Sequence, residues 1–287
     1  MPTPTIASAP RTVLTRDEID GFDRDGFHIH EVLFSPDELS VIADACERVA
    51  QRQYATGTPP DARGWEPEAP PQAVCKIDNA WKSDPAIAAA VTDERIGHIA
   101  AQLVRANGIR LWHDQYLRKP AAGGKIVTWH QDWMFWQCID RCRTVTCWIA
   151  LADVTSESGP MLFLAGSHHL GLQMQAKPGD WTGEHLSPPP ADGQRVVPVV
   201  MRAGQVSFHH GLLMHGSDRN HSDTDRVSLV THVMADDCAY RPGMPHVCEQ
   251  AMRRYDDHPA AGEPFRGPQF PYAWREDSAL DHAARGA

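Results

Sequence analysis

His130 and Asp132 lie two residues apart, directly after a stretch with strand character. Side chains at positions i and i+2 of an extended strand point to the same face, so this imidazole and this carboxylate can hold two adjacent corners of one metal ion. A third ligand from a distant strand, such as His215, would complete the set of two histidines and one carboxylate that binds non-haem Fe(II) in oxygenases. The spacing therefore predicts a mononuclear metal site.

Arg226 is a candidate for binding an anion. It lies eleven residues after His215 and begins the alternating apolar run 227–234, so its side chain is expected to enter a buried strand. A buried charge needs a partner, and a guanidinium can hold a carboxylate through two parallel hydrogen bonds. Asp223 and Asp225 are also close in sequence, and a surface ion pair with one of them is the alternative.

A second histidine–aspartate pair repeats the spacing of the first. His221 and Asp223 lie in the polar, turn-forming run 220–225, where ligands would be poorly pre-organised. His130 instead follows an apolar run and precedes several aromatic residues, and an iron that generates oxidants needs such a shielded pocket. His130 and Asp132 are therefore the predicted ligands.

The third ligand has three candidates within a short stretch of sequence. Residues 209 and 210 are adjacent in a predicted strand, so they face opposite sides and at most one points into the core. Either could be a buried histidine with a purely structural role. The spacing alone does not decide between His209, His210 and His215.

Several aromatic residues near the metal motif could form a wall of the active site. Such a wall would suit an apolar or cationic small molecule, although the same residues could equally belong to the core. They are Trp112, Trp133, Phe135 and Trp136.

The sequence resembles the phytanoyl-CoA dioxygenase (PhyH-like) family of Fe(II)/2-oxoglutarate oxygenases. The resemblance covers most of the chain and rests on an ordered set of segments. These segments are residues 14–27, 130–132, 148–153, 157–168 and 215–226.

The resemblance implies that Fe(II) is bound by His130, Asp132 and His215, with 2-oxoglutarate and O2 as cosubstrates. Oxidative decarboxylation would release succinate and CO2 and hydroxylate an unactivated C–H bond of a small metabolite or a natural-product intermediate. Related halogenases have Ala or Gly in place of the carboxylate, so Asp132 implies hydroxylation (or desaturation or cyclisation) and not halogenation. The chain has no basic cluster suited to coenzyme A, which disfavours an acyl-CoA substrate.

The resemblance also implies a binding site for the cosubstrate. Arg226 would hold the distal carboxylate of 2-oxoglutarate, and the hydroxyl of Ser217 would be a second donor. Gln115 matches a family position where a polar side chain hydrogen-bonds the cosubstrate, although it could be an ordinary strand residue.

Three other functions fit part of the pattern. A zinc-dependent hydrolase could use the same ligands, but it would leave Arg226 and Ser217 without a role and would need a general base near the metal-bound water. A catalytically silent member of the fold that binds metal or a 2-oxo acid is disfavoured because no expected ligand is missing. A β-sandwich interaction domain would have no reason to combine the metal ligands with Arg226. Metal content together with succinate release distinguishes these alternatives.

Composition sets broader limits. The chain has 287 residues, a formal net charge of -10 and 42% hydrophobic residues, which is typical of a globular protein with a substantial core. An acidic total disfavours binding to nucleic acids or anionic membranes. There is no membrane-spanning run or recognisable signal peptide, and seven cysteines without framework spacing fit a reducing cytoplasm. We expect a cytoplasmic protein with a small-molecule substrate and make no prediction of its oligomeric state.

The secondary structure that must position the site begins with helices. Thr15 with Glu18, and Ser35 with Glu38, match capping boxes and predict two helices, and a third is expected near 84–106. After these, short extended runs are separated by Gly, Pro, Asp and Ser turns, which predicts strands. The predicted strands cover residues 109–118, 125–130, 143–151, 161–164, 196–200, 204–210 and 226–235.

Many short strands after N-terminal helices predict a mainly β fold with a closed or sandwiched core. The family resemblance makes this core a double-stranded β-helix, the cupin-like jelly roll. The Pro- and Gly-rich segment 56–75 is expected to be either a lid or a plain surface connection. We expect a single domain over 1–287, with a flexible leader (1–13), helical support (14–108), the β core (109–240) and an irregular C-terminal segment (241–287).

Overall fold

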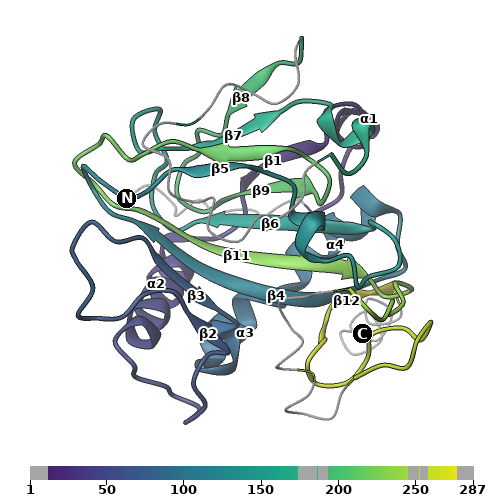
Figure 1. Cartoon of the computed structure of the whole chain (residues 1–287), viewed down its shortest axis with the longest axis horizontal. Helices are drawn as coiled ribbons and strands as arrows, with labels where there is room; N and C mark the ends of the chain where they lie inside the picture. Colours follow the sequence, from purple (N-terminus) through teal and green to yellow (C-terminus); the bar gives the residue numbers. More distant parts are fainter. Residues whose placement is uncertain (1–11, 174–185, 187–192, 245–251, 253–257, 277–287) are drawn as a thin grey trace, which may run out of the picture.

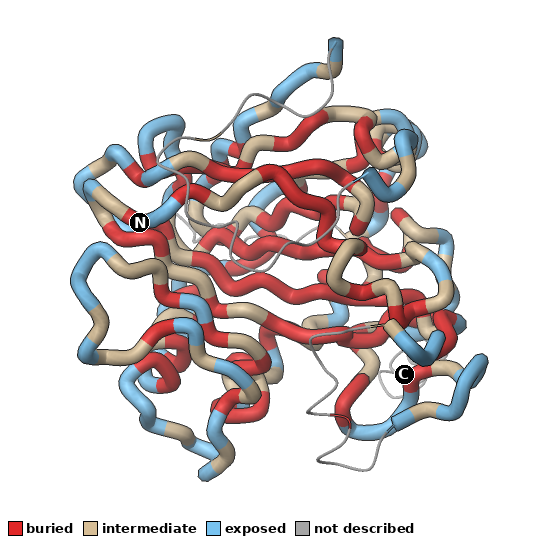
Figure 2. Tube along the Cα trace, viewed as in Figure 1, coloured by how far each residue is buried: buried red, intermediate tan, exposed pale blue. Residues whose placement is uncertain are grey.

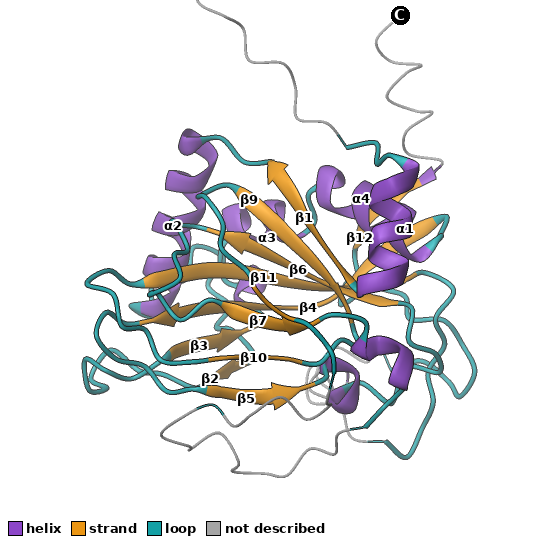
Figure 3. Cartoon of the chain, turned by 90° about the horizontal axis from the view of Figure 1, so that it is seen from above, coloured by secondary structure: helices purple, strands orange, loops and turns teal. Residues whose placement is uncertain are grey.

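A computed structural model describes residues 12–173, 186, 193–244, 252 and 258–276 of the chain. Its body consists of two antiparallel sheets, one of eight strands and one of four (Figure 1). The α-helices lie on one side of the larger sheet and the smaller sheet lies on the other (Figure 3). None of the helices described is long and apolar enough to cross a membrane. The predicted mainly β fold with N-terminal helices is confirmed.

The larger sheet joins strands from both ends of the chain. Its order is β1-β9-β6-β11-β4-β3-β2, and β12 pairs with β4 beside this path. The first and last strands of the described chain therefore belong to one sheet. The strands are β1 (Phe27–Val32), β2 (Ala62–Arg63), β3 (Cys75–Asp78), β4 (Gly108–Lys119), β6 (Thr144–Ala150), β9 (Gln205–His210), β11 (Arg226–Ala235) and β12 (Tyr272–Arg275).

The smaller sheet has the order β5-β10-β7-β8. Its strands are β5 (Val127–His130), β7 (Met161–Leu164), β8 (Val196–Pro198) and β10 (His215–Ser217). All seven strands expected after residue 108 are present, with ends that differ by up to two residues. Strands β2, β3, β10 and β12 were not predicted, because runs this short show too little alternation of apolar and polar residues to be recognised.

The two predicted N-terminal capping boxes are present. In α1 (Arg16–Asp25) the Thr15 side chain accepts from the Glu18 amide while the Glu18 carboxylate accepts from the Thr15 amide. Ser35 and Glu38 make the same pair of contacts at the start of α2 (Pro36–Ala50). Short 3-10 turns lie at η1 (Ala80–Lys82), η2 (Asp132–Phe135) and η3 (Ser167–Leu170).

The single helix predicted near 84–106 is wrong, because two helices occupy this stretch. They are α3 (Pro85–Val91) and α4 (Glu94–Val104). Asp93 has an extended backbone and its carboxylate accepts a hydrogen bond from the Arg95 amide at 2.8 Å, which caps α4. Aspartate is favourable at the start of a helix and unfavourable in a helix interior, so Asp93 favours two separate helices over one continuous helix. The apolar stripe continues across the break, and the capping signal within it was missed.

Most buried side chains lie in two layers. One layer lies between the helices and the larger sheet and includes Ile96, Ile99, Leu111 and Phe208. The other contains residues of both sheets, including Trp148 from β6 and Phe163 from β7. The central strands are buried along most of their length (Figure 2). Since β6 is buried at every position, its side chains have no freedom to move away from what they contact.

Two helical glycines allow a matched test of this packing. A Cβ at Gly97 of α4 would lie 2.5 Å from the Trp274 Cβ and 2.7 Å from the Ala273 carbonyl, whereas a Cβ at Gly21 of α1 would meet nothing closer than 3.8 Å. Gly21→Ala should therefore raise the free energy of unfolding by about 0.5–1 kcal/mol. Gly97→Ala should lower it by about 1–3 kcal/mol, because overpacking outweighs the gain in helix propensity. Denaturant titration measures both, and a stabilised Gly97→Ala protein would contradict the close contact.

Candidate functional site

The pairing of β5 with β10 brings together two of the histidines singled out in the sequence. His130, the last residue of β5, is directly opposite His215, the first residue of β10. Between the two motif residues, Gln131 is fully buried, and its amide donates to the carbonyl oxygens of Gly171 and Leu212. Asp132 then begins the short turn η2. Burial of Gln131 anchors the backbone between His130 and Asp132.

Three ligand atoms converge at this point. His130 Nε2 and His215 Nε2 each lie 3.7 Å from Asp132 Oδ1, and the two imidazole ring centres are 4.0 Å apart. The three residues form a group whose ligand atoms all lie within 4.8 Å of one another. Each residue is less than 10% exposed. This arrangement suits a single metal ion held from one side.

Backbone carbonyls fix which nitrogen of each histidine faces this point. His130 Nδ1 lies 2.9 Å from the Thr128 carbonyl oxygen, and His215 Nδ1 lies 3.0 Å from that of Leu213. A carbonyl oxygen can only accept, so both Nδ1 atoms carry the proton. In a neutral imidazole the other nitrogen then carries a lone pair, so each Nε2 is the atom that can bind a metal.

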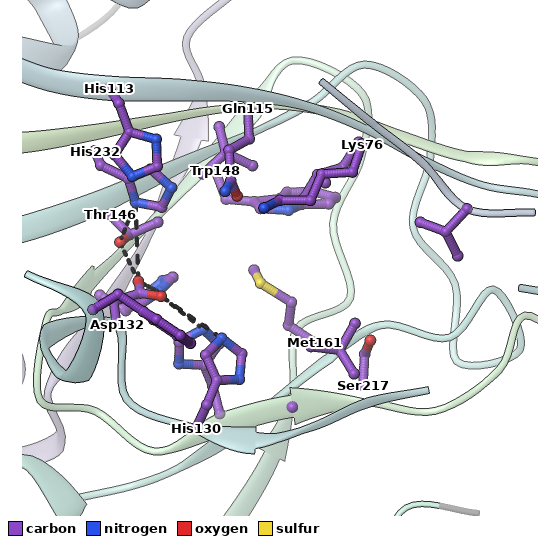
Figure 4. Close-up of a pocket in the computed structure, with 18 of the residues that line it drawn as sticks. Lys76, His113, Gln115, His130, Asp132, Thr146, Trp148, Met161, Ser217 and His232 are labelled. Carbon is purple, nitrogen blue, oxygen red and sulfur yellow. Dashed lines mark hydrogen bonds and ion pairs between the residues drawn. The ribbon is translucent and has the colours of Figure 1, made fainter. Parts of the chain in front are cut away.

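The second oxygen of Asp132 is held by the larger sheet. Thr146 of β6 donates its hydroxyl to Asp132 Oδ2 at 2.5 Å, and His209 of β9 donates from Nε2 at 3.2 Å. Because the Thr146 proton is used in this way, its oxygen must accept from His232 Nδ1, 2.9 Å away. Protein donors therefore satisfy Oδ2, while Oδ1 faces the two imidazoles (Figure 4).

The environment sets the charges that metal binding requires. Burial lowers the pKa of His130 and of His215 to about 4. Burial alone would raise the pKa of Asp132, but the neighbouring His215 and the hydrogen bond from His209 hold it well below its usual value. Near neutral pH the imidazoles are neutral and the carboxylate is charged. This is the ionisation state in which all three bind a metal.

These residues line a cavity of about 450 Å³. Its walls come from both sheets, and many of the residues alternate along a strand, such as His113 and Gln115 of β4 and Thr146 and Trp148 of β6. Within the segment 56–75, Trp65 is buried beside Arg118 and Val74 borders the cavity.

Arg226 borders the same cavity and is 5% exposed. It donates to the Gly159 carbonyl oxygen, and its guanidinium carbon lies 5.7 Å from the centre of the Trp148 ring. Asp225, a possible surface partner, instead accepts from the Ala121 amide. Burial lowers the pKa of Arg226 to about 10, so the side chain remains charged at neutral pH. A negative charge in the cavity would offset the cost of burying this cation.

Ser217 and Gln115 also border the cavity. The Ser217 oxygen accepts a hydrogen bond from Lys119 Nζ at 2.7 Å. The Gln115 amide donates to Asp78 Oδ1 at 2.8 Å, so one of its donors is already used. The structure therefore brings all three residues predicted to bind the cosubstrate to one cavity, together with the three predicted metal ligands.

Of the four aromatic residues expected to form a wall, Phe135 and Trp136 border the cavity. Trp112 lies outside it, stacked on Phe270 with ring centres 5.6 Å apart. Trp133 belongs to the same apolar cluster as Trp112 and also does not line the cavity. Closeness in sequence to the metal motif therefore did not distinguish the aromatic residues that line the cavity from those that are only part of the apolar core.

Several residues of the site were not identified from the sequence. His209 was considered as a metal ligand or as a buried structural histidine, and His113 and His232 had no assigned role. Period-two alternation along β4, β6 and β11 could have placed them on one face, but only with the strand order known. The polar and aromatic residues of the cavity wall that were missed are Lys76, His113, Thr146, Trp148 and His232, and Lys119 was missed behind Ser217.

Comparisons with known proteins agree with this geometry. The family model for phytanoyl-CoA dioxygenase (PhyH) matches residues 22–228. Ectoine dioxygenase of Bordetella parapertussis is 27% identical over 234 residues, which cover 75% of this chain and 74% of that protein. Phytanoyl-CoA dioxygenase domain-containing protein 1 of Mus musculus is 31% identical over 140 residues, which cover 46% of this chain and 48% of that protein.

Solved structures show the same fold. The non-haem α-ketoglutarate-dependent carbocyclase SnoK from nogalamycin biosynthesis has a TM-score of 0.72 and 25% identity, covering 90% of this chain and 96% of SnoK. EctD from S. alaskensis, solved with 2-oxoglutarate and 5-hydroxyectoine, has a TM-score of 0.68 and 23% identity, covering 93% of this chain and 92% of EctD. The predicted jelly-roll core is confirmed.

Removing the Thr146 hydroxyl tests the support of Asp132. In Thr146→Val the Asp132 carboxylate loses its shortest hydrogen bond and His232 Nδ1 loses its acceptor, so affinity for a divalent metal should fall about 10- to 100-fold. Thr146→Ser keeps the hydroxyl and should bind almost as tightly as the parent protein. Anaerobic calorimetric titration with Fe(II) measures the affinities. Equal affinity for the Val and Ser variants would show that the hydroxyl has no role at the metal centre.

Proposed function

Because the chain belongs to the phytanoyl-CoA dioxygenase (PhyH) family, we propose that it uses Fe(II), 2-oxoglutarate and O2 to hydroxylate an unactivated C–H bond of a small metabolite or natural-product intermediate. One oxygen atom would enter the substrate and the other the succinate that forms, with CO2, from 2-oxoglutarate. The observation that carries the proposal is the convergence of two imidazole nitrogens and one carboxylate oxygen in a cavity that also contains a buried arginine.

In this proposal His130, Asp132 and His215 hold Fe(II) through Nε2, Oδ1 and Nε2. Two imidazoles and one carboxylate on one side of the ion are the ligand set of non-haem Fe(II) oxygenases and leave open positions for cosubstrate and O2. Bound Fe(II) would activate O2, and the oxidation of 2-oxoglutarate and of the substrate would each supply two of the four electrons that reduce it. Thr146 and His209 keep Asp132 in place, because they occupy the oxygen that does not face the metal.

Arg226 holds the distal carboxylate of 2-oxoglutarate. Its guanidinium is buried, and among the hydrogen bonds of the described residues it has only the neutral Gly159 carbonyl as an acceptor. A carboxylate would supply the missing negative charge and accept two parallel hydrogen bonds. Ser217 and Gln115 border the same cavity and would position the bound molecule.

The remaining wall indicates a substrate with both apolar and hydrogen-bonding groups. Phe135, Met161 and Val230 provide apolar surface. The stacked imidazoles of His113 and His232 lie on the wall near Thr146 (Figure 4). Since His232 Nδ1 donates to Thr146, Nε2 is an acceptor in the neutral ring, and it has no hydrogen-bond partner among the described residues. A donor group on the substrate would satisfy it.

Succinate formation tests the function directly. With Fe(II), 2-oxoglutarate and O2, the protein should release little succinate alone and more when the correct substrate is added. Ectoine is the first compound to test, because several relatives are ectoine dioxygenases, and polar metabolites of similar size follow. Asp132→Ala is the matched inactive control. Metal-dependent hydrolysis without succinate would instead identify a hydrolase.

Arg226→Leu tests the cosubstrate site. The substitution leaves the distal carboxylate of 2-oxoglutarate in a desolvated pocket, and breaking a buried pair costs about 3–5 kcal/mol. The affinity for 2-oxoglutarate should therefore fall by about two to four orders of magnitude at about 1.4 kcal/mol per tenfold change. Anaerobic titration followed by the charge-transfer absorption of the Fe(II) complex measures this affinity.

Fe(II) affinity is the internal control in this experiment, because Arg226 is not a proposed ligand and the metal should bind almost unchanged. Arg226→Lys should restore part of the 2-oxoglutarate affinity, since it keeps the charge and loses the planar pair of donors. An Arg226→Leu protein that binds 2-oxoglutarate as tightly as the parent would refute this role.

A further inference from the structure

Lys119 is a buried basic side chain to which the proposed reaction assigns no role. It is the last residue of β4, lies opposite Arg226 at the start of β11, and is 1% exposed. Its ammonium group donates to Ser217 Oγ at 2.7 Å and to the carbonyl oxygen of Asp218. Lys119 does not border the cavity itself, so Ser217 lies between the lysine and the space where a ligand binds.

The structure thus places two basic side chains on directly paired residues, and both are buried. Lysine is almost never fully buried without a partner, and like charges repel most strongly where solvent is excluded. Within the described part of the chain, no carboxylate lies within ion-pair distance of Lys119 or Arg226. Burial, and then the charge of Arg226, lower the pKa of Lys119 to about 6. An anion bound in the neighbouring cavity would stabilise the charged forms of both side chains.

We propose that Lys119 is a positioning residue that acts through Ser217 to make the cavity selective for 2-oxo acids with a second, distal carboxylate. The proposal rests on the proposed function, since it places the distal carboxylate of 2-oxoglutarate beside Arg226 and Ser217. Beyond the proposed function, it assigns a role to a residue that does not touch the ligand. It also assigns a property to the cavity, which is discrimination between dianionic and monoanionic 2-oxo acids.

Hydrogen-bond chemistry explains how Lys119 acts on Ser217. An ammonium group can only donate, so the Ser217 oxygen must accept from a protonated Lys119. The single proton of the Ser217 hydroxyl is then free to be donated into the cavity. Without the ammonium group the hydroxyl could turn its proton away from the cavity. Lys119 therefore both orients the Ser217 donor and adds positive charge behind it.

The same arrangement couples cosubstrate binding to proton uptake. The charged groups that face Lys119 are Arg226 from β11, which lowers its pKa, and Asp218 after β10, which raises it. With a pKa of about 6, Lys119 is mostly neutral at pH 7.5 before the ligand binds. A distal carboxylate favours the ammonium form, so binding should take up a proton. Affinity for 2-oxoglutarate should accordingly fall as the pH rises above about 6.

The experiment compares two ligands of equal chain length, 2-oxoglutarate and 2-oxopentanoate, which lacks the distal carboxylate. Both are titrated anaerobically into the Fe(II) protein, and binding is followed by charge-transfer absorption and calorimetry. Lys119→Met should weaken 2-oxoglutarate about 10- to 100-fold, the usual range for a charge-assisted hydrogen bond, and should leave 2-oxopentanoate unchanged. Lys125→Met, at an exposed lysine of the following loop, is the matched control and should bind both ligands as the parent does.

A second variant and a measurement on the parent protein keep the proposal testable if Lys119→Met does not fold. Lys119→Gln keeps a donor and removes the charge, so it should lose part of the discrimination. Calorimetry of the parent in buffers of different ionisation enthalpy should show proton uptake at pH 7.5 with 2-oxoglutarate and much less with 2-oxopentanoate.

The outcomes separate this inference from the proposed function. A parent protein that binds no 2-oxoglutarate overturns the proposed function. If the parent binds it, equal losses for both ligands in Lys119→Met, or no loss for either, overturn the role of Lys119 and leave the proposed function in place. A selective loss of 2-oxoglutarate affinity, with Fe(II) affinity unchanged, supports the inference.

Discussion

Burial of the Asp132 carboxylate is the constraint on which the site depends. A charged group that is only 7% exposed must have each oxygen satisfied, or it takes up a proton and no longer binds a metal. Thr146 and His209 satisfy Oδ2 from β6 and β9, and the Thr146 oxygen is satisfied in turn by His232 from β11. Three neighbouring strands of the larger sheet thus serve one carboxylate, and the remaining oxygen faces the two imidazoles of the smaller sheet.

The site lies between the sheets because each sheet supplies a different part of it. The smaller sheet and the turn after β5 carry His130, Asp132 and His215, while the larger sheet carries the donors that orient Asp132. At the proposed cosubstrate end the sheets also share the site, because Ser217 comes from β10 and Arg226 from β11. Separation of the layers would therefore disrupt both ends of the cavity at once, which ties the site to the packing of the fold.

The sequence predicts what depends on local pattern. The long strands, the capping boxes and the residues of the histidine–aspartate motif follow from alternation, side-chain chemistry and family resemblance. Lys119 could not be found in this way, since nothing in its neighbourhood distinguishes it from a solvated lysine at a strand end. Its burial arises because Ser217, 98 residues later, is placed over it by a different sheet. Contacts of this kind depend on strand order, which a single sequence does not display.

The register of β4 with β11 has a consequence for how the cavity can change during evolution. His113 pairs with His232 near the metal end and Lys119 pairs with Arg226 at the other, with unbroken pairing between them. Inserting one residue into this ladder would turn the cationic side chain to the opposite face, so only insertions of two preserve its direction. Each such step adds about 6.6 Å, several times the length of a methylene group. Insertions in these strands can therefore change the length of the cavity only in large steps. Adaptation to a 2-oxo acid one carbon longer or shorter must come from substitution of side chains.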